Sequence, residues 1–197
     1  MSRVRDFKNS FEKFSVCPDI KLDIFRENYL SENYVSWLND SEVNRFLECR
    51  HSVNDITSCK NYIAENYFSD SSVLFVIVEG EKNAIGTVRI SNINEYYKTA
   101  DIGYLIGNPL FWGNGIATKC VRKVCCIGFE DLFLRKITAG YYASNIASCR
   151  LLNRLGFSQE ATLREQVIVG GVVEDVFRAG LFRGDLISQS TLGNRYA

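Results

Sequence analysis

The sequence predicts one α/β or α+β domain in which helices cover both faces of a mixed β-sheet. The chain has 197 residues, which suits one domain with a sizeable core. Short apolar segments with strand character alternate with segments of helical spacing, most regularly in the second half. Such alternation is typical of a sheet that is packed between helices.

The first half of the chain predicts a strand, two helices and a hairpin of two strands, at 21–27, 31–40, 56–68, 72–80 and 84–90. The segment 21–27 alternates apolar and polar residues, as a half-buried strand does. The run 72–80 is continuously apolar and ends at Gly80, which indicates a central strand buried on both faces. The polar turn 81–83 then leads into the next strand.

The second half predicts a strand, a helix, a strand, a helix and a closing hairpin, at 99–106, 117–130, 136–143, 145–155 and 166–182. In the second of these helices, Ala147, Leu151 and Leu155 are expected to face the core. Asn145 suits the N-cap and Gly156 the C-terminal end of that helix. The hairpin turns at Gly170-Gly171.

The composition argues against several classes of protein. Lys+Arg and Asp+Glu are both 23, so no basic excess favours a nucleic-acid partner. No apolar run reaches the roughly 20 residues of a membrane span. The seven cysteines form no CxxC pair, which favours a reduced, cytoplasmic chain. A single histidine, His51, argues against a zinc site or a Ser-His-Asp triad, so no metal is expected.

The stretch WGNGIATK at 112–119 is the strongest candidate for a binding loop. It does not fit GxxxxGK[ST], and Thr118 stands where a dinucleotide fingerprint needs its third glycine. An ordinary turn before a helix remains an alternative. However, the first N–H groups of a helix lack internal partners, the helix dipole favours anions, and glycine lets a phosphate approach the backbone. These properties favour a pyrophosphate-binding loop.

WGNGIA also resembles the acetyl-CoA pyrophosphate loop, Q/R-x-x-G-x-G/A, of the GNAT superfamily of N-acetyltransferases. Trp112 at the Q/R place is usual in its RimJ/RimL-like branch. Further segments resemble the same branch: WLNDSEVNRFL, TADIGYLIG, NIASCRLLNRLGF and GGVVEDVFRAGL. The resemblance covers about residues 20–183. It implies a mixed, mostly antiparallel sheet with two splayed parallel strands in the middle, within a domain at 19–184. Residues 1–18 would be an N-terminal extension and 185–197 a C-terminal tail.

The resemblance implies that the cosubstrate acetyl-CoA lies between strands 99–106 and 136–142. The residues expected to bind it are Tyr104, Leu105, Ile106, Trp112, Gly113, Asn114, Gly115, Ile116, Ala117, Thr118, Lys119, Asn145 and Ser148. Arg122 and Lys123 are further candidates for phosphate contacts. The alternatives, a solvated helix face for the cations and a plain helix cap for Asn145, remain open.

The resemblance also suggests catalytic residues. Asp101 takes the place of an acidic residue common in this branch and is the expected base. Many GNAT proteins have a general-acid tyrosine where this chain has Leu152, which leaves Ser148 as the expected partner of the leaving thiolate. Tyr141 and Tyr142 alternate faces on the next strand, so one of them is expected to line the cleft, and Tyr142 is the catalytic candidate of the two. Glu48 and its neighbours belong to the segment that usually binds the acceptor, and no role follows for them from the sequence.

The expected reaction is direct attack of a primary amine on acetyl-CoA in a ternary complex. A small molecule, such as an amino sugar or a nucleotide-linked amino sugar, is the expected acceptor. Five side chains suit stacking and phosphate contacts with such a molecule: Trp37, Arg50, Arg89, Tyr96 and Tyr97. The alternatives are a protein N-terminus of the ribosomal kind and a CoA-binding module without turnover. The chain is expected to be a monomer or a homodimer.

Overall fold

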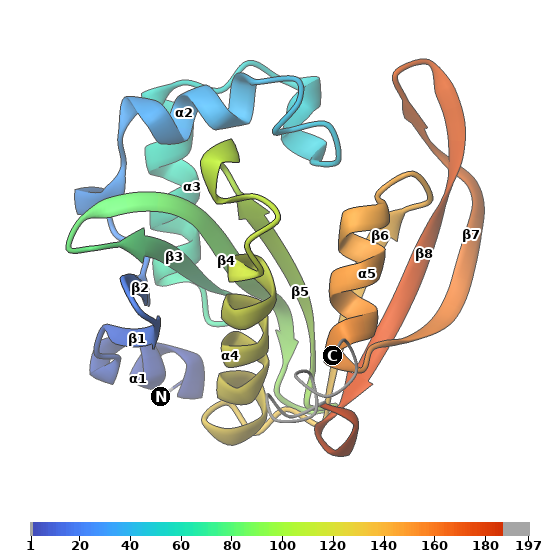
Figure 1. Ribbon diagram of the computed structural model, residues 1–197. Helices are drawn as coiled ribbons and strands as arrows, with labels where there is room; N and C mark the ends of the chain where they lie inside the picture. The colour runs from blue at the N-terminus through green and yellow to red at the C-terminus, as the bar shows by residue number, and fades with distance from the viewer. Residues whose placement is uncertain (1, 187–197) are drawn as a thin grey trace.

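The fold is one eight-stranded sheet with helices on both faces, in a computed structural model that describes residues 2–186 (Figure 1). The strand order is β1-β2-β3-β4-β5-β6-β8-β7. The strands are β1 (Phe14–Cys17), β2 (Ile20–Ile24), β3 (Val73–Glu79), β4 (Asn83–Asn94), β5 (Thr99–Ile106), β6 (Lys136–Tyr142), β7 (Ser158–Val169) and β8 (Val172–Phe182). The main helices are α1 (Arg3–Ser10), α2 (Glu32–Asn39), α3 (Ile56–Phe68), α4 (Ile116–Glu130) and α5 (Ile146–Leu155). The predicted fold class is confirmed.

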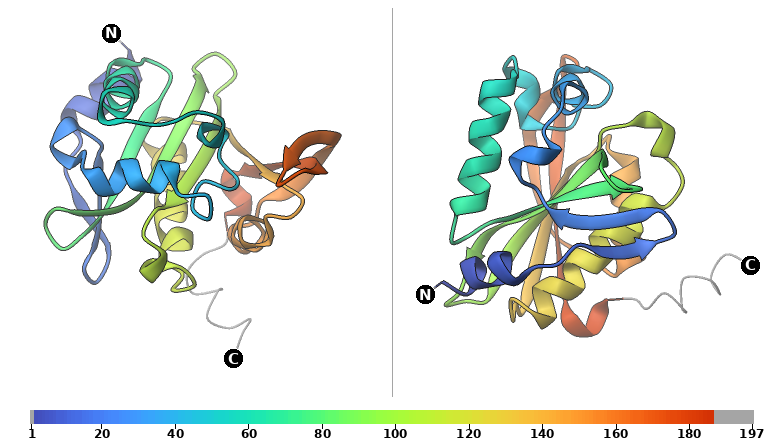
Figure 2. Two further views of the ribbon diagram at one scale, coloured as in Figure 1. Left: turned by 90° about the horizontal axis from the view of Figure 1, so that it is seen from above. Right: turned by 90° about the vertical axis from the view of Figure 1, so that its left-hand side faces the viewer.

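Two separate cores lie on the two faces of the sheet. Helices α1, α4 and α5 pack on one face, and α2 and α3 pack on the other (Figures 1 and 2). Strand β3 contributes to both cores, because Val73, Phe75 and Ile77 point to the first while its intervening apolar residues point to the second. The predicted burial of this strand on both faces is confirmed.

The only parallel pair among the described strands is β5 with β6, and it is short. Its partners are Thr99↔Lys136, Ala100↔Ile137 and Asp101↔Thr138. Beyond these pairs β5 stays paired with β4 as far as Ile106, and β6 stays paired with β8 as far as Tyr142. The two strands therefore part in the middle of the sheet, as expected for the splayed pair.

The N-terminal residues pack against the domain. Residues 1–18, expected as an extension, include α1 and β1, and β1 pairs with β2. Val4 and Lys8 are buried, and the Lys8 ammonium donates to the carbonyls of Asn66, Tyr67 and Ser69 at 2.6–2.8 Å. Lys8 thus closes the C-terminal end of α3. The expected tail at 185–197 lies outside the described residues from 187 onward.

Helix α5 confirms its two predicted ends and corrects one face position. Asn145 accepts a hydrogen bond from the main-chain N–H of Ser148 at 3.1 Å, and Gly156 ends the helix with a left-handed φ of 96°. Leu151 and Leu155 are buried as expected. Ala147, which was also expected to face the core, is exposed because the buried stripe runs through Leu151, Leu152 and Leu155 instead.

Candidate active site

The glycine loop forms an open cradle at the start of α4. Gly113 and Gly115 have left-handed φ values of 75° and 72°, and a Cβ on either would meet nothing within 4 Å. Ile116 is the first residue of the helix. Among residues 2–186, no hydrogen bond is donated by the main-chain N–H groups from Gly113 to Thr118. These groups are available to an anion, and the helix dipole favours one there.

The loop is held in place by the segment before it. Asn108 caps a short 3-10 turn, Pro109–Phe111, by accepting from the N–H of Leu110 at 3.1 Å. The indole N–H of Trp112 donates to the carbonyl of Ile106 at 2.7 Å. Trp112 therefore ties the loop back to the end of β5, and its one donor is already used.

The cations near the loop differ in their availability. Lys119 is exposed, one turn into α4. Arg122 has two buried guanidinium nitrogens, Nε and Nη2, that lack a hydrogen-bond partner. Lys123 instead lies over the ring of Phe14, 5.0 Å from its centre, so it belongs to packing against β1. Because an orphaned buried guanidinium is costly, Arg122 is the cation best suited to an anionic ligand.

A second orphaned donor lies between β5 and α5. The Tyr104 hydroxyl is buried and has no hydrogen-bond partner of standard geometry. Burial raises the pKa of Tyr104 to about 12, against a smaller lowering effect of nearby Ser148. Tyr104 therefore keeps its proton at neutral pH. Tyr104 and Ser148 place two hydroxyl groups together at the helix that Asn145 caps.

Asp101 is engaged at both carboxylate oxygens. One oxygen accepts from the Thr138 hydroxyl and from Arg178 at 2.8 Å, and the other accepts from Asn92 at 2.8 Å. Burial raises the pKa of Asp101, but the donors Thr138, Asn92 and Arg178 outweigh it and leave the pKa lowered. Such a carboxylate is a weak proton acceptor, which disfavours the base role expected for Asp101.

Hydrogen bonds among Tyr142, Glu48 and Arg50 join β6 to the segment before α3. The Tyr142 hydroxyl donates to Glu48 and accepts from Arg50 at 3.1 Å. The Arg50 guanidinium also lies over the Tyr142 ring, 5.2 Å from its centre. Figure 1 shows this segment, which follows α2, reaching toward β6. Sequence reasoning assigned no role to Glu48, because 94 residues separate it from Tyr142.

The parallel register places this group beside the gap between the strands. Extending the register of Asp101 with Thr138 makes Leu105 and Tyr142 the corresponding residues at the level where the strands have parted. Gly103 and Gly140 are exposed positions on the way to that level. The α2/α3 face of the gap is thus free of side chains at Gly103, whereas the Arg178 side chain lies over Gly140. Asp101 stands at the closed end of the gap and Tyr142 at its open end.

The side chains expected to stack on a nucleotide do not gather here. Trp37 is buried, and a Cβ on Gly107 would overlap its ring. Tyr96 and Tyr97 pack on each other in the turn before β5, at the opposite end of that strand from the glycine loop. Arg89 bonds to Ser72 and lies over Tyr62. Of this set only Arg50 lies by the gap.

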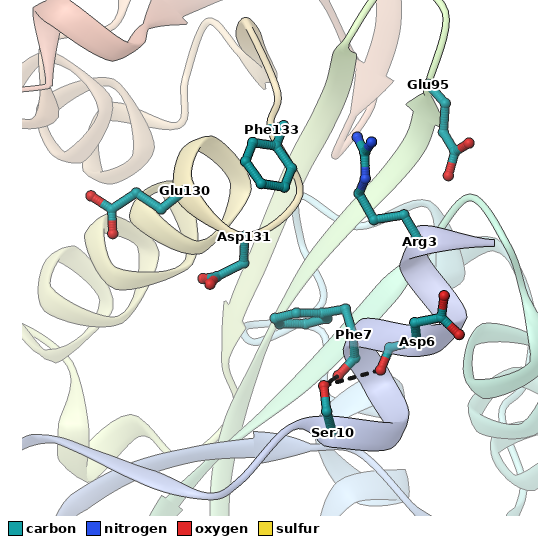
Figure 3. A pocket seen from close by; sticks show the side chains of 8 residues that line it. All are labelled: Arg3, Asp6, Phe7, Ser10, Glu95, Glu130, Asp131 and Phe133. Atoms are coloured by element: carbon teal, nitrogen blue, oxygen red, sulfur yellow. Dashed lines mark hydrogen bonds between the residues drawn. The ribbon is translucent and has the colours of Figure 1, made fainter. Parts of the chain in front are cut away.

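A separate hollow of about 720 Å³ lies at the far end of α4 from the glycine loop (Figure 3). It is lined by Arg3, Asp6, Phe7, Ser10, Glu95, Glu130, Asp131 and Phe133. Because it contains none of the groups described above, we do not assign it to the same chemistry.

Neither a metal cluster nor a membrane helix is found within residues 2–186. No group of three or more His, Cys, Asp or Glu side chains there is arranged to hold a metal ion. No helix in that part of the chain is long and apolar enough to span a membrane. All seven cysteines are free thiols.

Comparison with known proteins gives a consistent family. The family described as "Acetyltransferase (GNAT) domain" matches residues 22–158, more than half of the chain. An uncharacterized N-acetyltransferase, YoaA of Bacillus subtilis, is 31% identical over 148 residues, which cover 74% of this chain and 83% of that protein. The spermidine N(1)-acetyltransferase of Vibrio cholerae is 28% identical over 116 residues, covering 59% and 66%.

The solved structures agree on the fold. The structure of RimL, a ribosomal L7/L12 alpha-N-protein acetyltransferase in complex with coenzyme A, superposes with a TM-score of 0.77 at 17% identity. The match covers 87% of this chain and 98% of that one.

Proposed function

This chain belongs to the GNAT acetyltransferases, and on that premise we propose that it transfers the acetyl group of acetyl-CoA to a primary amine of a small molecule. The family supplies the reaction class, an acetyl-CoA-dependent N-acetyltransferase. The observation that carries the proposal is the open glycine cradle beside the gap between β5 and β6. The cradle offers main-chain donors to the pyrophosphate, and the gap offers strand edges to the arm that bears the thioester.

The residues present suit acetyl-CoA in three respects. Gly113 and Gly115 leave room for a phosphate, and Arg122 supplies two unpartnered donors. Leu105 and Ile106 border the gap and can offer main-chain groups to the arm. Tyr104 supplies a buried hydroxyl without a partner.

We propose that Ser148 and Tyr104 together serve the leaving thiolate. Acetyl transfer forms a C–N bond and breaks the C–S bond, and the departing sulfur takes up a proton. The Tyr104 hydroxyl lies beside Ser148 in the first turn of α5, and Leu152 provides no acid. Asp101 keeps a positioning role, because it fixes Arg178 and Thr138 where the strands part.

The cradle is tested by replacing Gly115 with valine. A β-branched residue is strained at a φ of 72° and places methyl groups where the phosphate is expected, so acetyl-CoA binding is expected to be lost. Gly171→Val is the matched control, because Gly171 has a φ of 83° and equally open surroundings but lies in the β7–β8 turn. Calorimetry measures both affinities. Unchanged affinity in Gly115→Val would remove the cradle from the proposal.

The acceptor is tested with an amine panel while released CoA thiol is followed. The panel contains small mono- and diamines, amino sugars and a peptide with a free α-amine. We expect the small amines to react best. A preference for the peptide would favour a protein N-terminus, and tight CoA binding without thiol release from any acceptor would favour a binding module.

A further inference from the structure

We propose that Glu48 is the carboxylate that receives the ammonium group of the acceptor and takes its proton before the amine attacks. The inference rests on the proposed amine acetyltransferase function. It adds a residue that comes from outside the sheet, in the short 3-10 turn Glu48–His51 between α2 and α3.

Glu48 is fixed and open at the same time. One of its oxygens accepts from the Tyr142 hydroxyl, while its side chain is 76% exposed. Arg50 holds Tyr142 from the other side and is itself only 13% exposed. A carboxylate oriented by a buried tyrosine, with its remaining acceptor sites facing solvent, suits a cationic ligand.

The position of Glu48 matches the reacting level of the gap. By extension of the parallel register, Tyr142 corresponds to Leu105, whose main chain borders the expected thioester site. Gly103 has no side chain and nothing near its Cβ position, so the α2/α3 face of the gap is open to an acceptor on the β5 side, whereas the Arg178 side chain lies over Gly140. An acceptor that enters over Gly103 would meet Glu48 beside the strand ends.

The other carboxylates near this end are already engaged. Asp101 binds Arg178, Thr138 and Asn92. One oxygen of Glu174 accepts from the main-chain N–H of Ser144 at 2.9 Å. Glu48 and Glu174 thus each keep one oxygen without a hydrogen bond to any described residue, and of the two it is Glu48 that the Tyr142 side chain of β6 orients beside the gap.

The charged and titratable groups that face Glu48 are few. From its own turn they are Arg50, at 3.8 Å, His51, at 4.0 Å, and the neighbouring Cys49 thiol. From β6 the group is Tyr142. Arg50 is committed to Tyr142 and to the carbonyl of Leu47, so an incoming ammonium does not have to displace it.

Acetyl transfer to the ammonium form of the acceptor releases one proton overall. The acceptor enters as R–NH3⁺ and gives one proton to Glu48, which later releases it to solvent. The neutral amine forms the C–N bond, and the nitrogen then loses its second proton as the C–S bond breaks. That proton leaves on the CoA thiol, so the products are the amide, CoA thiol and one free proton.

The test is Glu48→Gln, assayed with the best small amine of the panel across pH 6 to 10. Without the carboxylate only the neutral amine reacts, so kcat/KM is expected to fall about 100-fold at pH 7. The ratio of the wild-type kcat/KM to that of Glu48→Gln is expected to fall by about tenfold for each pH unit as the pH rises toward the pKa of the amine. Glu48→Asp should regain part of the rate.

Glu42→Gln is the matched control, because Glu42 is an exposed carboxylate in the same connection; it should keep the wild-type profile. Acetyl-CoA binding, measured by calorimetry, should be unchanged in all three variants. Wild-type rate and profile in Glu48→Gln, or loss of acetyl-CoA binding there, would overturn the role of Glu48. Absence of turnover in the wild-type protein with every amine would instead defeat the proposed function.

Discussion

At the residue scale, the least expected finding is where the proton donors lie. Tyr104 was expected to bind acetyl-CoA, but the sequence did not reveal that its side chain carries a buried hydroxyl without a partner. Its strand position explains this, because alternate residues of β5 point to opposite faces and Tyr104 points with Ile102 to the α4/α5 side. The alternation can be predicted from the sequence. The position of Ser148 of α5 beside Tyr104 cannot.

Ser148→Ala is expected to lower kcat about 100-fold while acetyl-CoA affinity stays within threefold, because the hydroxyl acts on the departing sulfur rather than on the bound thioester. Thiol release at saturating substrate measures kcat. Ser144→Ala is the control, since Ser144 precedes the same helix and engages its neighbours through its main chain. Equal effects in the two variants would argue for a structural role of Ser148.

Asp101 leads to a prediction about stability and pH. Its pKa in the folded chain lies below the ordinary value of 3.8, so the unfolded chain takes up the proton first as pH falls. The contribution of Asp101 is therefore complete above that ordinary value and is lost as pH falls through the folded pKa. Thermal melting from pH 6 to pH 2 should show a steeper acid loss for the wild type than for Asp101→Asn. Parallel curves would contradict this.

At the scale of elements, Lys8 makes the buried polar contact of the N-terminal helix, beside the apolar packing of Val4 and Phe7. Lys8 gives one donor to each of three carbonyls at the end of α3. Lys8→Met removes all three hydrogen bonds, so the free energy of unfolding should fall by about 2 kcal/mol. Urea denaturation measures it. Arg5→Met is the control, because the Arg5–Asp70 pair is exposed and contributes at most about 0.5 kcal/mol.

The elements themselves show what a single sequence can predict. Helix α3 matches its predicted range, because apolar spacing and an Asp55 capping box mark it locally. Strand β7 begins eight residues before the predicted start at 166, because its exposed residues show no apolar alternation. Helix α1 was missed, since its place depends on the distant contacts of Lys8. Sequence patterns within an element predict that element, whereas elements that depend on contacts with distant residues are not predicted.

The site follows the same division. The glycine loop and the cap at Asn145 could be predicted because their chemistry is contiguous in the chain. The Asp101–Arg178 pair joins residues 77 apart, and the Tyr142–Glu48 bond joins residues 94 apart. The first requires the register of β5, β6 and β8, and the second requires the α2–α3 connection to pack against β6; no local pattern contains either.

At the scale of the whole molecule, the sheet has a weak seam. The two sides of the splayed region are joined by three residue pairs, in which Thr99 to Asp101 pair with Lys136 to Thr138. A ligand that fills the gap contacts both sides, so acetyl-CoA should stabilise the whole fold. At 100 times its Kd the gain is about 2.7 kcal/mol, or roughly 5–10 °C in Tm.

Differential scanning fluorimetry with and without acetyl-CoA measures this shift. Gly115→Val should melt at or below the temperature of the unliganded wild type, because valine is strained at that φ, and should show no shift on addition of acetyl-CoA. A full shift in that variant would mean that the ligand stabilises the chain from another place.

The chain contains two tryptophans, and their surroundings differ sharply. Trp37 is buried against Gly107. Trp112 is 38% exposed, and its indole N–H bonds the glycine loop to the carbonyl of Ile106. The molecule thus carries its own optical reporter. A water-soluble quencher should reduce the fluorescence of Trp112 before that of Trp37. If an added nucleotide protects the Trp112 fluorescence from quenching, that protection reports binding at the loop without an attached label.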